Sequence, residues 1–212
     1  MRNKIQGAPE LAVVEVENMG RSAFLLRGAL AVGAVYGAAS VSPFVRRAFA
    51  QGSMGDVDIL NFALTLEYLE AAFYQQGGEQ VSGLSSEVAD LVKTVGDEEQ
   101  EHVDALSATI SDLGGKPVKA PAVDFADAFA SQDAFLALAQ TFEDTGVSAY
   151  NGAAPMVESK ELLATAGAIV QVEARHAAAI RLQNGESPAP EAFDRTLDEA
   201  QVLDAVQPFI KA

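Results

Sequence analysis

Each of the two histidines in this 212-residue chain follows a glutamate by three positions, which gives the pairs Glu99–His102 and Glu173–His176. Residues three apart share one face of an α-helix, so each pair can present a carboxylate and an imidazole to a single point. Iron and manganese both accept this mixture of ligands. Two simpler interpretations are a solvated helix face and a buried hydrogen bond between the two side chains.

The apolar residues around each pair favour a position in the protein core. They recur at intervals of three or four, which is the spacing of a buried helix face, and both pairs interrupt such a stripe. Nearest to the pairs, the stripes contain Val95, Leu106, Ile169 and Ile180. Two other predicted helices each place a single glutamate in the same way, at Glu67 and Glu143. Each of four helices is therefore expected to hold one carboxylate inside.

Four buried glutamates need compensating positive charge. An isolated ionised carboxylate in a dry core would cost on the order of tens of kcal/mol, and no lysine or arginine lies on the predicted core stripes. Two divalent cations would balance four carboxylates and leave the histidines neutral. Di-iron and di-manganese carboxylate proteins have the same arrangement, with one glutamate from each of two helices and one Glu-x-x-His from each of the other two. The predicted metal ligands, through which any catalysis would run, are Glu67, Glu99, His102, Glu143, Glu173 and His176.

The chain also contains an internal repeat. In the first copy Glu67 precedes the glutamate of the Glu-x-x-His pair by 32 residues, and in the second copy Glu143 precedes it by 30. A tyrosine follows that single glutamate by seven residues in both copies, at Tyr74 and Tyr150. These tyrosines are expected to be core aromatics with a bonded hydroxyl, or to contact a carboxylate of the metal site. A repeated pair of half-sites is what a symmetric two-metal centre needs.

Three neighbouring glutamates admit other interpretations. Glu70 lies one helical turn after Glu67 and could be an alternative ligand, an acceptor for a ligand or a solvated residue. The apolar stripe passes through Glu67, which favours that residue as the ligand. Glu98 and Glu101 flank the first Glu-x-x-His pair on other faces of the helix and are expected at the surface.

Four long helices would carry these residues. By the apolar spacing, the predicted helices run from about Asp56 to Gln76, Ser85 to Leu113, Gln132 to Val157 and Ser159 to Gln183, with a short fifth from Leu197 to Phe209. The glycine pairs at 77–78 and 114–115 are expected to end the first two helices, and Pro155 to kink or shorten the third. The connection over residues 114–131 is long, whereas the other two are short. The sequence therefore predicts an all-α, ferritin-like four-helix bundle of two antiparallel hairpins joined by a long crossover.

An apolar, uncharged segment over residues 28–45 precedes the first of these helices. Arg21 and Arg27 lie before it, and Ala48-Phe49-Ala50 follows as a small-x-small pattern, which is the layout of a cleaved export signal. An uncleaved membrane anchor and a buried helix are the alternatives, since about 18 to 20 apolar residues can span a bilayer. The expected parts are an export signal or anchor over residues 1–50, the bundle over 51–189 and a tail with a short helix over 190–212.

Composition excludes several classes of function. The net charge of −16 argues against nucleic acid as a partner, because phosphate contacts need clustered lysine and arginine. The absence of cysteine excludes disulfides, thiol catalysis and iron–sulfur clusters.

Four segments resemble the ferritin-like superfamily between about Asp56 and Asn184. They are LNFALTLEYLEAAFYQQG, DEEQEHVDAL, AQTFEDTGVSAYNGA and IVQVEARHAAAIRL. The first is most similar to exported bacterial ferritin-like domain proteins and plant desiccation-related proteins. The resemblance implies that Glu99 and Glu173 bridge the two ions. Members of the superfamily include iron-storage ferritins, peroxide-reducing rubrerythrins, manganese catalases and oxygenase subunits, so the fold alone does not select a reaction.

We therefore expect an exported protein that binds two Fe or Mn ions and reacts with oxygen or peroxide, as an oxidase, peroxidase or catalase. Its location would be the periplasm, the cell envelope or the extracellular space, and residues 28–45 would attach an uncleaved form to a membrane. A second expectation is a non-catalytic, stress-related envelope protein whose metals brace the bundle. A third is iron storage.

Overall fold

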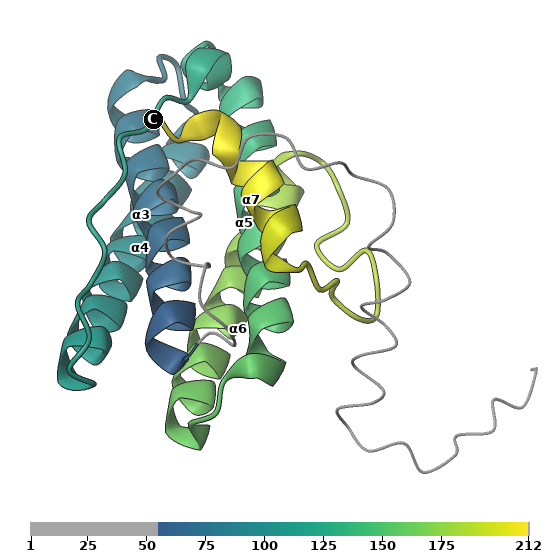
Figure 1. Ribbon diagram of the computed structural model, residues 1–212. Coiled ribbons are helices and arrows are strands. Elements are labelled where there is room, and N and C mark those ends of the chain that lie inside the picture. Colours follow the sequence, from purple (N-terminus) through teal and green to yellow (C-terminus); the bar gives the residue numbers. More distant parts are fainter. Residues whose placement is uncertain (1–54, 212) are drawn as a thin grey trace, which may run out of the picture. The chain divides into compact units, whose positions relative to one another are not determined.

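The computed structural model describes residues 55–211, which form a bundle of four long helices and a short C-terminal helix (Figure 1). The long helices are α3 (Asp56–Gln80), α4 (Ser86–Asp112), α5 (Gln132–Ala153) and α6 (Lys160–Gln183), and the short one is α7 (Glu199–Val206). Three short 3-10 helices are η1 (Ala126–Phe129), η2 (Ala154–Met156) and η3 (Gln207–Phe209). α3 packs chiefly on α4 and α5 on α6, so the predicted all-α bundle of two hairpins is confirmed. The predicted export segment lies outside the described residues.

Serine side chains begin three of the long helices. Ser85, Ser131 and Ser159 each accept a hydrogen bond from the backbone amide three residues later, which satisfies one of the free amides of the first helical turn. The predicted starts at Ser85 and Ser159 are thereby confirmed. Pro155 shortens the third helix as expected, because α5 ends at Ala153 and a 3-10 turn follows.

The predicted end of the first helix was wrong. α3 continues through Gly77 and Gly78 to Gln80. A β-carbon at Gly77 would lie 2.1 Å from Cε2 of Phe135 on α5. This glycine therefore allows α3 and α5 to approach closely and does not end the helix.

The crossover between the hairpins is held at two points. Asn61 on α3 donates from Nδ2 to the Lys116 carbonyl at 3.3 Å and accepts at Oδ1 from the Val118 amide at 2.8 Å. Further along, Val123 forms an antiparallel bridge with Ile210 of the C-terminal segment. The crossover is thus joined to both ends of the described chain.

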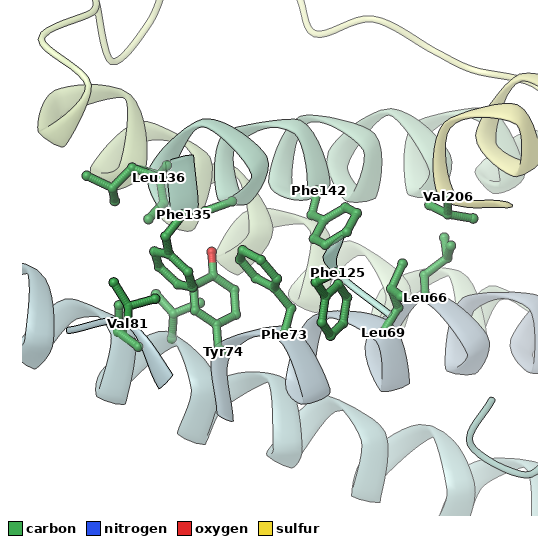
Figure 2. Packing of buried hydrophobic residues seen from close by; sticks show 14 of the residues in the cluster. Leu66, Leu69, Phe73, Tyr74, Val81, Phe125, Phe135, Leu136, Phe142 and Val206 are labelled. Carbon is green, nitrogen blue, oxygen red and sulfur yellow. The ribbon is translucent and has the colours of Figure 1, made fainter. Parts of the chain in front are cut away.

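Buried apolar side chains form two clusters, and most members of each cluster lie on opposite sides of the predicted metal ligands. On one side is the aromatic cluster, in which Phe73 stacks on Phe135 with ring centroids 4.6 Å apart (Figure 2). α7 contributes Val202 and Val206 to this cluster. On the other side, the aliphatic cluster contains Leu60, Leu64, Val103, Leu106, Ile110, Tyr150, Leu162 and Ile169. None of the helices within residues 55–211 is long and apolar enough to cross a membrane.

Candidate metal centre

All six predicted ligands are buried at the middle of the bundle, on four different helices. α3 and α5 each supply one glutamate, and α4 and α6 each supply one Glu-x-x-His pair. The four glutamates have no exposed surface, and His102 and His176 are 9% and 4% exposed. Their burial follows from their places on the apolar stripes, because the flanking turns of each helix pack into the two apolar clusters.

The six residues form two overlapping groups, in each of which one potential ligand atom per residue lies within 4.8 Å of the others. The His102 half-site consists of Glu67, Glu99, His102 and Glu173. The His176 half-site consists of Glu99, Glu143, Glu173 and His176. Glu99 and Glu173 belong to both groups, and this is the arrangement that bridging carboxylates require.

The Nδ1 atom of His102 faces three carboxylates. It lies 3.2 Å from Glu67 Oε2, 3.2 Å from Glu99 Oε2 and 3.1 Å from Glu173 Oε1. One nitrogen and three oxygens from three helices therefore converge on a small volume.

The Nδ1 atom of His176 occupies the equivalent place in the second half-site. It lies 2.8 Å from Glu99 Oε1 and 3.5 Å from Glu143 Oε2. The other ring nitrogen, Nε2, lies 2.6 Å from Oε2 of Glu98. His176 thus has carboxylates at both ring nitrogens.

Several buried ligand atoms face the centre without a hydrogen-bond partner in the described part of the chain. They are Glu99 Oε1, Glu143 Oε2, both carboxylate oxygens of Glu173 and His176 Nδ1. Although Glu99 Oε1 and His176 Nδ1 are close, they are not oriented to bond to each other. Buried polar atoms are normally paired, and a set that converges without pairing suits a cation. The residues present therefore fit the predicted metals.

In the absence of metal, protons compensate the buried carboxylates. Burial alone would lower the pKa of His102, but the surrounding carboxylates of Glu173, Glu67 and Glu99 raise it to about 12. Burial would likewise lower the pKa of His176, and the neighbouring carboxylates of Glu143 and Glu99 raise it to about 11. Burial raises the pKa of both Glu67 and Glu143 to about 7. Metal binding must displace such protons, because only neutral imidazole and ionised carboxylate are ligands.

The two repeated tyrosines connect the half-sites to the opposite helix. The Tyr74 hydroxyl on α3 donates to Glu143 on α5, and the Tyr150 hydroxyl on α5 donates to Glu67 on α3. Both expectations for these residues are therefore confirmed, because each ring lies in an apolar cluster and each hydroxyl bonds to a carboxylate of the site. Each bond orients one carboxylate and leaves its second oxygen free to face the centre.

Glu70 is a seventh side chain of this centre and is 3% exposed. Its equivalent in the internal repeat is Gly146, since each lies three residues after the single glutamate of its unit. A β-carbon at Gly146 would lie 2.9 Å from Glu173 Oε2 and 3.1 Å from Glu70 Oε1. Glu70 therefore occupies space that the glycine leaves beside a shared carboxylate. Burial, and then the charge of Glu173, raise its pKa well above the usual range.

Glu98 is the residue that the sequence interpretation missed. It was expected at the surface, and its side chain is 46% exposed, yet it contacts His176. The contact joins residues 78 positions apart on α4 and α6, so helical periodicity carries no signal for it. Glu101 is exposed as expected.

An opening of about 230 Å³ leads from the surface to the histidine side of the centre. Its lining residues are Glu98, Glu101, His102, Val172 and Arg175. All five come from α4 and α6, so the opening lies at the seam between these two helices and includes His102 in its lining.

The class of ferritin-like proteins is defined by a bundle of two hairpins joined by a long crossover. Two of its helices each carry one inward glutamate, and the other two each carry one Glu-x-x-His. The family model for the ferritin-like domain matches residues 55–186, well over half of the chain. The chain therefore belongs to the ferritin-like domain family. A search of curated proteins finds no match.

Proposed function

We propose that this protein binds two divalent Fe or Mn ions at the six residues and carries out redox chemistry with oxygen or peroxide. The observation that supports the proposal is the convergence of the six side chains into two half-sites that share Glu99 and Glu173. With both histidines neutral, four glutamates would balance two divalent ions. When bound, a pair of redox-active ions exchanges electrons with an oxidant.

The chain's own residues would prepare and protect this centre. Tyr74 and Tyr150 orient one carboxylate in each half-site, and the apolar clusters keep bulk water from the remaining sides. The opening between α4 and α6 would admit metal ions and a small oxidant. Loading releases protons from the imidazoles and from Glu67 and Glu143, so metal affinity should increase with pH.

Metal analysis and turnover measurements test the proposal together. Protein purified without chelators should contain about two Fe or Mn ions per chain, and the loaded protein should consume oxygen or peroxide. The double variant His102→Ala, His176→Ala should contain neither metal while keeping its helical circular dichroism. A wild-type protein free of both metals would overturn the proposal.

A second candidate is a non-catalytic protein whose metals brace the bundle. All four long helices contribute ligands, so bound ions would cross-link both hairpins. In this case chelation would lower the stability of the protein, while the loaded protein would show no oxidase, peroxidase or catalase turnover. Iron storage is a third candidate and requires a large assembly, so a monomeric or dimeric mass in solution would count against it.

Export is a further part of the proposal, supported by the apolar segment at 28–45 and its flanking residues. The resemblance to exported bacterial and desiccation-related proteins supports it too. Cell fractionation and N-terminal sequencing of the mature protein test it. A new N-terminus near Gln51 indicates a cleaved signal, whereas intact protein in the membrane fraction indicates an anchor.

A further inference from the structure

The two half-sites differ on the outer side of their histidines. His176 directs Nδ1 at the centre and Nε2 at Glu98, whose Oε2 lies 2.6 Å away. His102 also directs Nδ1 at the centre. Within residues 55–211, however, no carboxylate pairs with its Nε2. Among the described residues, a carboxylate therefore accepts from the N–H group opposite the metal-facing nitrogen at His176 but not at His102.

The internal repeat explains this difference. Glu99 and His102 correspond to Glu173 and His176, so the position equivalent to Glu98 is occupied by Val172. Val172 and His102 both line the opening between α4 and α6. Where one half-site has a carboxylate, the other has an isopropyl group that cannot accept a hydrogen bond.

We propose that Glu98 is a positioning residue that makes the His176 half-site the tighter of two unequal metal sites, so that the first ion binds there. This inference rests on the proposed binding of two ions. A carboxylate that accepts the N–H of a ligating histidine fixes the tautomer and the ring orientation and makes the ligating nitrogen more basic. Losing such a partner typically weakens metal binding by about 10–100-fold.

Titration of the metal-free, full-length protein with Mn²⁺ tests the inference, with free Mn²⁺ followed by electron paramagnetic resonance and heat by calorimetry. The wild type should bind two ions in two resolved steps. Glu98→Ala should weaken the first step about 10–100-fold and leave the second unchanged. Glu98→Gln keeps a neutral acceptor and should have a smaller effect.

Two further variants separate a positioning role from loss of surface charge. Glu101→Gln removes the same charge from the same opening, but the Glu101 side chain forms no hydrogen bond or ion pair with either histidine in the described structure, so both steps should be unchanged. Val172→Glu places a carboxylate at the equivalent position beside His102 and should strengthen the second step. At one equivalent of Mn²⁺, His102→Ala should retain the tight step and His176→Ala should lose it.

The outcomes distinguish this inference from the proposed function. Two bound ions with affinities that Glu98→Ala leaves unchanged would overturn the inference alone. Equal weakening by Glu98→Ala and Glu101→Gln would also overturn it, because the effect would then be one of charge. A wild type that binds no Mn²⁺ and no Fe²⁺ would overturn both.

Discussion

At the scale of single residues, the centre contains more titratable groups than a helical bundle normally buries. In the metal-free protein Glu67 and Glu143 hold protons to about pH 7, and the histidines hold theirs to still higher pH. Burial alone would raise the pKa of Glu99, but the neighbouring histidines lower it to about 2. The same side chains thus accept either protons or metal ions, and stability should depend on which of the two is available.

The metal-free protein should be most stable near pH 4.5. The pKa values of Glu67 and Glu143 are higher in the folded protein, about 7, than their ordinary value of 4.5. Their protonation therefore stabilises the fold, fully below pH 4.5 and less and less as the pH rises through about 7. The histidines contribute stability that is complete below pH 6.5 and lost on the way to about pH 11 or 12. The lowered pKa of Glu99 acts oppositely, and its contribution is lost as the pH falls from 4.5 towards 2.

Denaturant unfolding in the presence of a chelator, at pH values from 3 to 9, measures this dependence. The free energy of unfolding should decrease between pH 5 and pH 8. A free energy that increases over that interval would contradict the assigned proton positions. With saturating metal the decrease should be smaller, because the bound ions compete with the protons.

Replacing either buried tyrosine should weaken the half-site that it supports. Tyr74→Phe and Tyr150→Phe keep the aromatic volume but remove a hydrogen bond to a buried carboxylate, which is worth about 1.5–3 kcal/mol. Both variants should lose stability and bind metal more weakly. Tyr68→Phe is the control, since the Tyr68 hydroxyl has no hydrogen bond in the described structure. Unfolding curves that coincide for all three variants would show that the hydroxyl bonds of Tyr74 and Tyr150 do not stabilise the protein.

The convergence of the six residues was predictable because each lies on an apolar stripe, and a stripe defines a direction towards the core. Glu70 and Glu98 were not predictable by this reasoning. The burial of Glu70 depends on the space left by Gly146 on another helix, and the contact of Glu98 depends on how α4 crosses α6. Periodicity within one helix contains neither piece of information.

At the scale of the helices, glycines have different roles that the sequence does not distinguish. Gly146 on α5 faces two carboxylates, whereas a β-carbon at Gly167 on α6 would have no neighbour within 4 Å. Gly77 was expected to end a helix and instead allows a close contact. Helix starts were easier to predict, because a serine cap accepts a hydrogen bond from a backbone amide only three residues later.

Gly146→Ala and Gly167→Ala should therefore have opposite effects. Alanine favours a helix by about 1 kcal/mol over glycine, and at Gly167 this gain should appear as higher stability with unchanged metal binding. At Gly146 the added methyl should displace Glu70 and Glu173, cost about 1–3 kcal/mol through overpacking and weaken metal binding. Thermal unfolding and Mn²⁺ titration of both variants measure this. Equal metal affinities for the two would contradict the proposed packing around Glu70.

At the scale of the whole molecule, bound ions should join the two hairpins. Binding at a free concentration 100-fold above the dissociation constant stabilises a protein by about 2.7 kcal/mol per site. For a domain of this size 1 kcal/mol shifts Tm by about 2–4 °C, so chelation should lower Tm by roughly 5–10 °C for each ion removed. The double variant His102→Ala, His176→Ala should show no change on chelation. An equal change in that variant would place the stabilising ions elsewhere.

The order in which a chain is synthesised gives the C-terminal segment a particular importance. Each hairpin needs only neighbouring sequence, and both can form while later residues are still being added. The aromatic cluster, however, includes Val202 and Val206, and the crossover is paired through Ile210, beyond the last residue that the family model matches. The end of the bundle beside Phe73 therefore cannot close until residues 202–210 have left the ribosome. Until that moment Phe125 and Phe142 lack the ring of Phe209, which contacts both of them in the folded protein.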